Sequence, residues 1–254
     1  MFSSNRMSSP LLSRREAFRL GALGIAAVAL PKLAAADSDG AASFRGSPKR
    51  LGYFKGTRLP SKPVVLWSFS PAQLSPRGVQ VHSPLVADGV VYFGNDVGQV
   101  HALKAADGEV IWRHDHLNRI TSSASVLGPR VYFTSNRGAF ALSLKDGNQL
   151  WEYAVDGGAL ESSPLAMSGE VFFAACNGNL YSLDTETGAR RWVADFIADT
   201  PEPPSPEFDG KRARSGDNLA RPGTCASDGS TILLPVFDQS RLLAFDCKDG
   251  ARRW

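Results

Sequence analysis

The sequence has no hydrophobic run long enough to cross a membrane. Its longest apolar stretch covers residues 21–30, whereas a spanning helix needs about 20 apolar residues. Cysteine is scarce, with three residues in 254 and no CxxC pair, which excludes a disulfide scaffold. The region beyond residue 63 also lacks an apolar face of helical period. What is present is a globular composition, with 43% hydrophobic residues, sufficient for a sizeable core.

Basic residues are concentrated at the start of the chain. Residues 1–36 contain five Lys or Arg and one acidic residue, whereas the remainder is close to neutral. The net charge of +3 therefore reflects the leader and does not indicate a nucleic-acid-binding domain. We expect no nucleic-acid partner.

The first 36 residues have the three parts of an export signal in order. Arg14 and Arg15 come first, the mild apolar stretch 21–30 follows, and small residues end at Ala36. The arginine pair resembles a twin-arginine signal, although the aromatic Phe18 lies one position later than usual. We expect cleavage after Ala36 and a periplasmic or cell-envelope location by the twin-arginine route. An amphipathic N-terminal helix is the alternative.

Two stretches are predicted to lie outside regular structure. Residues 37–63 are rich in Ser, Gly, Pro and Ala and carry six basic residues against two acidic ones, which predicts a flexible basic linker. This linker either contacts anionic lipid or peptidoglycan or is simply solvated. Residues 195–222 contain five prolines, which predicts a surface insertion that either carries recognition or is solvated.

An internal repeat of about forty residues dominates the rest of the chain. Val91-Tyr92-Phe93 recurs forty residues later at Val131-Tyr132-Phe133 and again at Val171-Phe172-Phe173, and a fourth copy begins at Thr224-Cys225. Every copy ends with a Gly four residues before a Trp, and a Leu or Phe lies nine residues before that Trp. Four copies with two fixed spacings indicate a duplicated structural unit.

Each copy is predicted to form four short strands. In the first copy these are residues 83–87, 90–94, 99–104 and 109–114, separated by turns rich in Asp, Asn and Gly. Such turns are hairpin signals, because these residues tolerate the positive φ of tight turns. Units of this length and strand number predict an all-β fold, a β-propeller of four-stranded antiparallel blades over residues 64–254.

The recurring tryptophans are predicted to join neighbouring blades. An indole buries on the order of 200 Å² and its N–H can still find an acceptor, which suits a face-to-face contact. The residues concerned are Trp112, Trp151, Trp192 and Trp254. The strand around Trp67 resembles the same strand without its preceding blade, and could add to another blade and lock the ring.

A family signature lies in residues 178–192. It consists of Ser182-Leu183-Asp184, then Thr187-Gly188, then Trp192, and it resembles the pyrroloquinoline-quinone (PQQ) type of propeller repeat. The resemblance covers residues 64–254. Similar repeats occur in quinoprotein dehydrogenases and in the BamB family of outer-membrane assembly factors, so the resemblance implies the fold and leaves the activity open.

Propellers that this repeat resembles usually have seven or eight blades, whereas four copies are visible here. We therefore expect the N-terminal part of a longer protein, folded as an open arc of about four blades. Each Å² of apolar blade face left in water costs roughly 25 cal/mol. A closed, symmetric ring of four blades would contradict this expectation.

Residue types that often carry chemistry give weak signals. The histidines are His82, His101, His114 and His116; the third and fourth form an HxH pair with no third metal ligand in view. His101 falls at a packing position of the repeat, and the recurring serines are interpreted as structural. Cys225 and Cys247 fall in one copy and could pair in an oxidising compartment. We predict no catalytic residue and no metal site.

Two functions remain open. One is a non-catalytic, exported, BamB-like scaffold, which needs no cofactor and binds protein partners or a cell-envelope polymer through loops and strand edges. The other is a PQQ-dependent periplasmic dehydrogenase. In the enzymes that it would resemble, a calcium-bound quinone lies over the propeller axis, often on a disulfide of adjacent cysteines. No two cysteines are adjacent here, and no residue matches the calcium ligands. A sensor for a sugar or polymer is a third interpretation.

Overall fold

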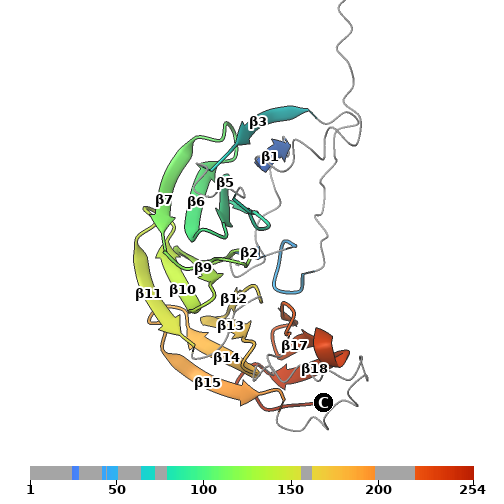
Figure 1. The fold of residues 1–254 in the computed structure, drawn as a ribbon. Helices are drawn as coiled ribbons and strands as arrows, with labels where there is room; N and C mark the ends of the chain where they lie inside the picture. Colours follow the sequence, from blue (N-terminus) through green and yellow to red (C-terminus); the bar gives the residue numbers. More distant parts are fainter. Residues whose placement is uncertain are drawn as a thin grey trace, which may run out of the picture.

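Each repeat copy folds as an antiparallel sheet, and the sheets follow one another along an arc (Figure 1). The structure is a computed structural model that describes residues 25–28, 42–43, 45–50, 64–71, 79–155, 162–197 and 221–254. None of the helices in these ranges is long and apolar enough to cross a membrane. The prediction of an all-β propeller is confirmed.

The blades share one strand order, in which consecutive strands pair with each other. The first blade contains β4 (Leu85–Ala87), β5 (Val90–Gly94), β6 (Gln99–Lys104) and β7 (Val110–Asp115). The second contains β8 (Ser125–Leu127), β9 (Arg130–Thr134), β10 (Gly138–Ser143) and β11 (Gln149–Ala154). The third contains β12 (Leu165–Met167), β13 (Glu170–Ala174), β14 (Asn179–Asp184) and β15 (Arg190–Asp195). The fourth contains β16 (Ala226–Ser227), β17 (Thr231–Val236) and β18 (Arg241–Asp246), with an isolated bridge from Phe245 to Arg252 beyond them and the short 3-10 turn η1 (Phe237–Gln239) before β18.

The blades form an open arc, as the repeat count led us to expect. In Figure 1, β7, β11 and β15 run along the outer rim, and the opposite edges of these sheets face the hollow side. The middle strands β5, β9 and β13 are buried over their last four residues without alternation, because neighbouring strands and blades cover both of their faces. The apolar clusters accordingly join adjacent blades: one spans blades one and two, another blades two and three, and a third blades three and four.

The strand around Trp67 has a partner that sequence reasoning did not find. This strand, β3 (Val65–Phe69), pairs antiparallel with β1 (Ile25–Val28), rather than with another blade. An open strand edge can pair with an extended segment, and Ile25–Val28 supplies one. β1 lies inside the predicted export signal, whereas Arg14, Arg15 and Ala36 lie outside the described residues.

The predicted linker is not solvated throughout. We call residues 42–43 and 45–50 the arm; its strand β2 (Ala42–Ser43) pairs antiparallel with β8 and becomes the fifth strand of the second blade. Ala42 is 9% exposed and Ser43 is fully buried. In Figure 1 the arm lies in the hollow of the arc. For these residues the expectation of a flexible linker is corrected: β8 presents an inner edge with unpaired backbone groups, and the arm satisfies them.

Candidate functional site

The tryptophans and glycines of neighbouring repeats meet at every joint between described blades. Each indole lies against the glycine turn of the following blade and donates its Nε1–H to a backbone carbonyl there. The contacts are Trp67 with Gly108 and the oxygen of Ala105 (3.0 Å), Trp112 with Gly147 and Leu144 (2.9 Å), Trp151 with Gly188 and Thr185 (3.1 Å), and Trp192 with Gly250 and Cys247 (3.0 Å). The acceptor is always two residues beyond the recurring Leu or Phe. One indole thus provides both apolar contact and a satisfied donor.

Two constraints, the backbone conformation and a close contact, require glycine in each of these turns. At Gly147 φ is +72°, which an L side chain adopts only at a cost. A Cβ built there would also lie 2.6 Å from Cε3 of Trp112, closer than real Cβ contacts occur. The sequence explained this glycine by turn geometry alone. The second reason, room for the indole of the preceding blade, emerges only from the structure.

Trp254 differs from the other predicted docking residues. Its side chain is 60% exposed, because the described residues contain no glycine turn against it. Its backbone oxygen accepts a hydrogen bond from the Ala244 N–H at 3.0 Å, so its backbone position is fixed by β18. The structure therefore places Trp112, Trp151 and Trp192 inside blade joints and leaves Trp254 open.

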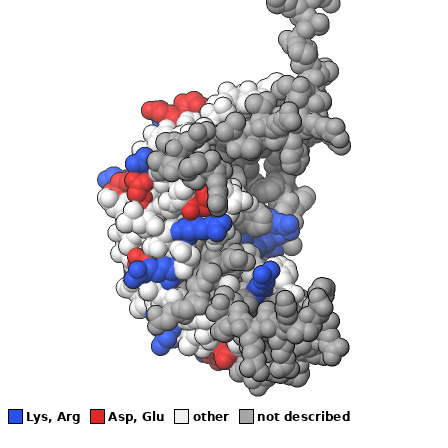
Figure 2. All heavy atoms as spheres, viewed as in Figure 1, with Lys and Arg blue, Asp and Glu red and all other residues white. Residues whose placement is uncertain are grey.

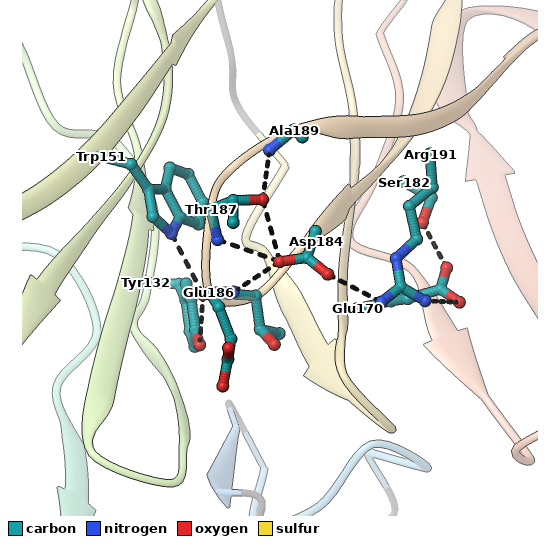
Figure 3. A network of polar contacts seen from close by, with 10 residues as sticks. Tyr132, Trp151, Glu170, Ser182, Asp184, Glu186, Thr187, Ala189 and Arg191 are labelled. Atoms are coloured by element: carbon teal, nitrogen blue, oxygen red, sulfur yellow. Dashed lines mark hydrogen bonds and ion pairs between the residues drawn. The ribbon is translucent and has the colours of Figure 1, made fainter.

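The family signature forms a network of polar contacts around the turn of the third blade (Figure 3). One carboxylate oxygen of Asp184 accepts from the backbone N–H groups of Glu186 and Thr187, both at 2.9 Å, and from the Thr187 hydroxyl at 3.0 Å. The other accepts from the Arg191 guanidinium at 2.8 Å, which also pairs with Glu170 at 3.1 Å. The Arg191 guanidinium and the turn N–H groups hold the pKa of Asp184 well below its usual range. The signature aspartate thus shapes the turn on which Trp151 rests.

The same device recurs in the fourth blade. Asp246 accepts from the Lys248 N–H at 2.8 Å and from the Arg253 guanidinium at 2.8 Å, and Arg253 also donates to the Thr231 hydroxyl at 2.6 Å. Arg253 lowers the pKa of the Asp246 carboxyl. Because repetition accounts for these ionic groups, we assign them to the scaffold rather than to catalysis.

Three of the four histidines, His101, His114 and His116, pack against aromatic rings. His101 is 4% exposed and stacks on Phe93 with ring centroids 5.1 Å apart, and burial lowers its pKa to about 4. His116 stacks on Phe140 at 3.9 Å, with its Nε2 3.3 Å from the Ser135 hydroxyl. The His114 and His116 rings are 6.2 Å apart, and no group of three metal-binding side chains gathers anywhere in the described ranges.

The recurring hydroxyls link blades to one another. The Ser123 N–H donates to the Ser163 hydroxyl at 3.0 Å, and the Ser163 N–H donates to the Thr224 hydroxyl at 3.2 Å. These hydrogen bonds between blades, which we call the hydroxyl ladder, agree with the structural role that the periodicity of the serines suggested. The cysteines Cys225 and Cys247 are free thiols, so the pairing considered from sequence is not formed.

The arm is held by contacts to three blades. Besides the β2–β8 pairing with the second blade, Arg50 donates from Nη2 to the Pro164 oxygen of the third blade at 3.1 Å. Its Nε donates to the Cys225 oxygen of the fourth blade at 2.6 Å, and the Ser227 N–H donates to the Pro48 oxygen at 3.1 Å. Burial lowers the pKa of Arg50 to about 10. The arm was missed from sequence because two paired residues leave no periodic pattern.

A pocket of about 520 Å³ opens between the arm and the fourth blade. The described residues that line it are Arg45, Lys49 and Arg50 of the arm, and Pro222, Gly223, Thr224, Ala226, Pro235 and Phe237 of the blade region. Three of them are basic and none is acidic. Figure 2 shows Lys and Arg side chains gathered on the hollow side of the arc, where the arm lies. Of the predicted insertion 195–222, residues 198–220 lie outside the described residues.

The described ranges gather no group of three His, Cys, Asp or Glu side chains, and the hollow side near the pocket presents cations from the arm. Cys176, Cys225 and Cys247 are separate free thiols and offer no disulfide platform.

Two kinds of relative share the repeats of this chain. The chain is 31% identical over 147 residues to the outer membrane protein assembly factor BamB of Yersinia pestis, which covers 48% of this chain and 37% of that protein. It is 26% identical over 157 residues to the quinoprotein ethanol dehydrogenase of Pseudomonas putida, covering 52% and 25%. The chain thus spans well under two thirds of these relatives.

Solved structures bear out the fold. The quinohemoprotein alcohol dehydrogenase ADHIIG of Pseudomonas putida superposes with a TM-score of 0.55 at 19% identity, covering 68% of this chain and 33% of that one. Residues 64–254 match the family model described as outer membrane protein assembly factor BamB. This match takes in every described blade, and the chain therefore belongs to the BamB family of propeller proteins.

Proposed function

We propose that this chain is an exported, non-catalytic binding scaffold that works in the assembly of outer-membrane proteins. The observation that carries the proposal is the family match, which extends over residues 64–254 and so over all described blades. Several curated relatives bear the same name, including those of Yersinia pestis and Shewanella oneidensis.

The geometry supports binding rather than catalysis. Several described residues of types that could perform chemistry are engaged in the scaffold: His101 and His116 stack on aromatic rings, and Ser163 lies in the hydroxyl ladder. In contrast, the surface offers contact groups. Leu117, in the loop between the first two blades, is 89% exposed at a φ of +68°. Exposed loops on a rigid propeller are a common place for protein recognition.

Complementation tests the proposal directly. A strain that lacks the gene is expected to contain less folded outer-membrane protein and to be more sensitive to large antibiotics, and the wild-type gene restores both. The Leu117→Asp variant should restore them less well than the matched control Lys145→Asp, which changes an exposed turn of the second blade. Unchanged outer-membrane protein levels in the deletion strain would reject the proposal.

Export by the twin-arginine route is part of the same proposal. A reporter fused behind residues 1–36 should reach the periplasm, and replacement of Arg14 and Arg15 by lysine should retain it in the cytoplasm. The control Arg19→Lys, outside the pair, should leave export intact. Export of the lysine pair at the wild-type level would reject this route.

A PQQ-dependent dehydrogenase is the second candidate, favoured by the 26% identity to the quinoprotein ethanol dehydrogenase. The full chain supplied with PQQ and calcium should be assayed for dye-linked ethanol oxidation, with PQQ binding followed by absorbance. Turnover would overturn the scaffold proposal. Failure to bind PQQ would remove the enzyme.

A further inference from the structure

We propose that the pocket between the arm and the fourth blade binds a small organic anion. The arm cations would hold its phosphate or carboxylate group, and Phe237 would pack against its apolar body. This inference is independent of the scaffold function, since it concerns a cavity that the blade joints do not use.

The charge of the pocket comes from one short segment. Arg45, Lys49 and Arg50 lie within six residues of the arm and all line the cavity. Arg45 and Lys49 line the pocket and are exposed to solvent, so an incoming ligand can meet them. Neighbouring charges of one sign in a concave site add their potentials and raise the local concentration of the opposite ion. The ligand that this potential selects is an anion.

The third cation is held in a fixed position. The Arg50 guanidinium donates to the Cys225 and Pro164 oxygens, so its plane is oriented by two blades. Burial lowers its pKa to about 10, which leaves it charged at neutral pH in a poorly hydrated place. With its Nε and Nη2 on these carbonyls, Arg50 contributes its positive charge to the pocket, and low hydration strengthens the attraction of that charge for an anion.

The opposite wall of the pocket is apolar. Phe237 is 69% exposed, so its ring offers an apolar surface to a ligand in the pocket. Its ring is packed on Gly223, where an added Cβ would lie 2.8 Å from the ring and 2.7 Å from Pro235. The cavity volume of about 520 Å³ falls within the range of small-molecule sites, about 300–1,000 Å³. An inorganic ion would leave this wall uncovered, so the wall selects a ligand with an organic body.

Four probes distinguish the contribution of the arm cations from that of the apolar wall. Isothermal titration calorimetry of the full chain should compare the binding of phenyl phosphate, benzoate, inorganic phosphate and benzyl alcohol. We expect phenyl phosphate or benzoate to bind more tightly than inorganic phosphate, and benzyl alcohol not to bind measurably. The tighter of the two aromatic anions identifies the head group. Binding should weaken as salt is raised, because partly exposed charges are screened.

Matched variants connect binding to the pocket. Lys49→Glu should weaken both phenyl phosphate and inorganic phosphate by about tenfold, since it replaces an attractive charge by a repulsive one. Phe237→Ala should weaken phenyl phosphate but leave inorganic phosphate unchanged. Lys145→Glu, the same charge change on the exposed turn after β10, should alter neither. Circular dichroism of each variant establishes that the blades are intact, and both pocket side chains are exposed enough to be replaced without unfolding.

The result that would overturn the proposal is specific. If no aromatic anion binds at millimolar concentration, or if Lys49→Glu and Lys145→Glu weaken binding equally, the pocket is not an anion site. Neither result would affect the complementation experiment, so the two proposals can fail separately.

Discussion

Replacing Gly147 by alanine isolates the contact that joins two blades. Gly147 has a φ of +72°, and its Cβ would lie 2.6 Å from the Trp112 indole. Gly89 provides a matched control, because its φ is +77° and its Cβ would meet nothing within 4 Å. The backbone strain of about 1–2 kcal/mol and the loss of unfolded-state freedom are common to both variants. Only the collision with the indole differs.

The size of the difference follows from overpacking. Forcing one extra carbon into a closed contact costs about 1–3 kcal/mol, and each kcal/mol lowers Tm by about 2–4 °C in a chain of this length. Gly147→Ala should therefore melt about 2–12 °C below Gly89→Ala. Thermal unfolding followed by circular dichroism measures this, and tryptophan fluorescence reports whether Trp112 has moved. Equal melting temperatures would refute the view that the glycine is required by the indole.

Three further predictions concern the same structure. Trp151→Ala should destabilise the chain by about 3–5 kcal/mol, whereas Trp151→Phe, which keeps a ring but loses the hydrogen bond to Thr185, should cost less than half of that in urea unfolding. Burial holds the pKa of His101 at about 4, below the 6.5 of an unfolded histidine, so the unfolded state binds the proton first and the free energy of unfolding falls as the pH drops from about 6.5 to 4. His101→Phe, which introduces the residue found at the equivalent Phe140, should remove about 3 kcal/mol of this acid sensitivity. An unchanged dependence of stability on pH would contradict the assignment. Arg50→Ala should expose the arm to limited proteolysis, because it removes the hydrogen bonds to Cys225 and Pro164, whereas Lys49→Ala should not; equal cleavage of both would show that Arg50 does not hold the arm.

The blade architecture was predictable because its signals are local and repeated. Turns such as Asp107-Gly108 and the β-branched strand after Gly89 fix each hairpin within about ten residues, and repetition confirms each assignment three times over. The first-blade strand limits agree with the structure to within two residues, as β4 (Leu85–Ala87) against the expected 83–87 illustrates.

What could not be predicted depends on contacts between distant residues. Arg50 and Cys225 are 175 positions apart, and nothing in their local sequence indicates a hydrogen bond. The two paired residues of β2 are too few for a period to appear. The pocket follows from these contacts, since its cations belong to the arm and its apolar wall to the fourth blade. The hydroxyl ladder could be predicted only in part, because the sequence shows the periodicity of its residues but not their hydrogen-bond partners.

The joint between indole and glycine has a direction. Each blade carries the donor on one flank and the matching turn on the other, so neighbours fit only head to tail. An in-frame gain or loss of one whole blade would leave every remaining Trp opposite a glycine turn, whereas a gain or loss of half a blade would leave one Trp and one glycine turn without partners. Evolution can therefore lengthen or shorten such a chain one blade at a time without changing any interface.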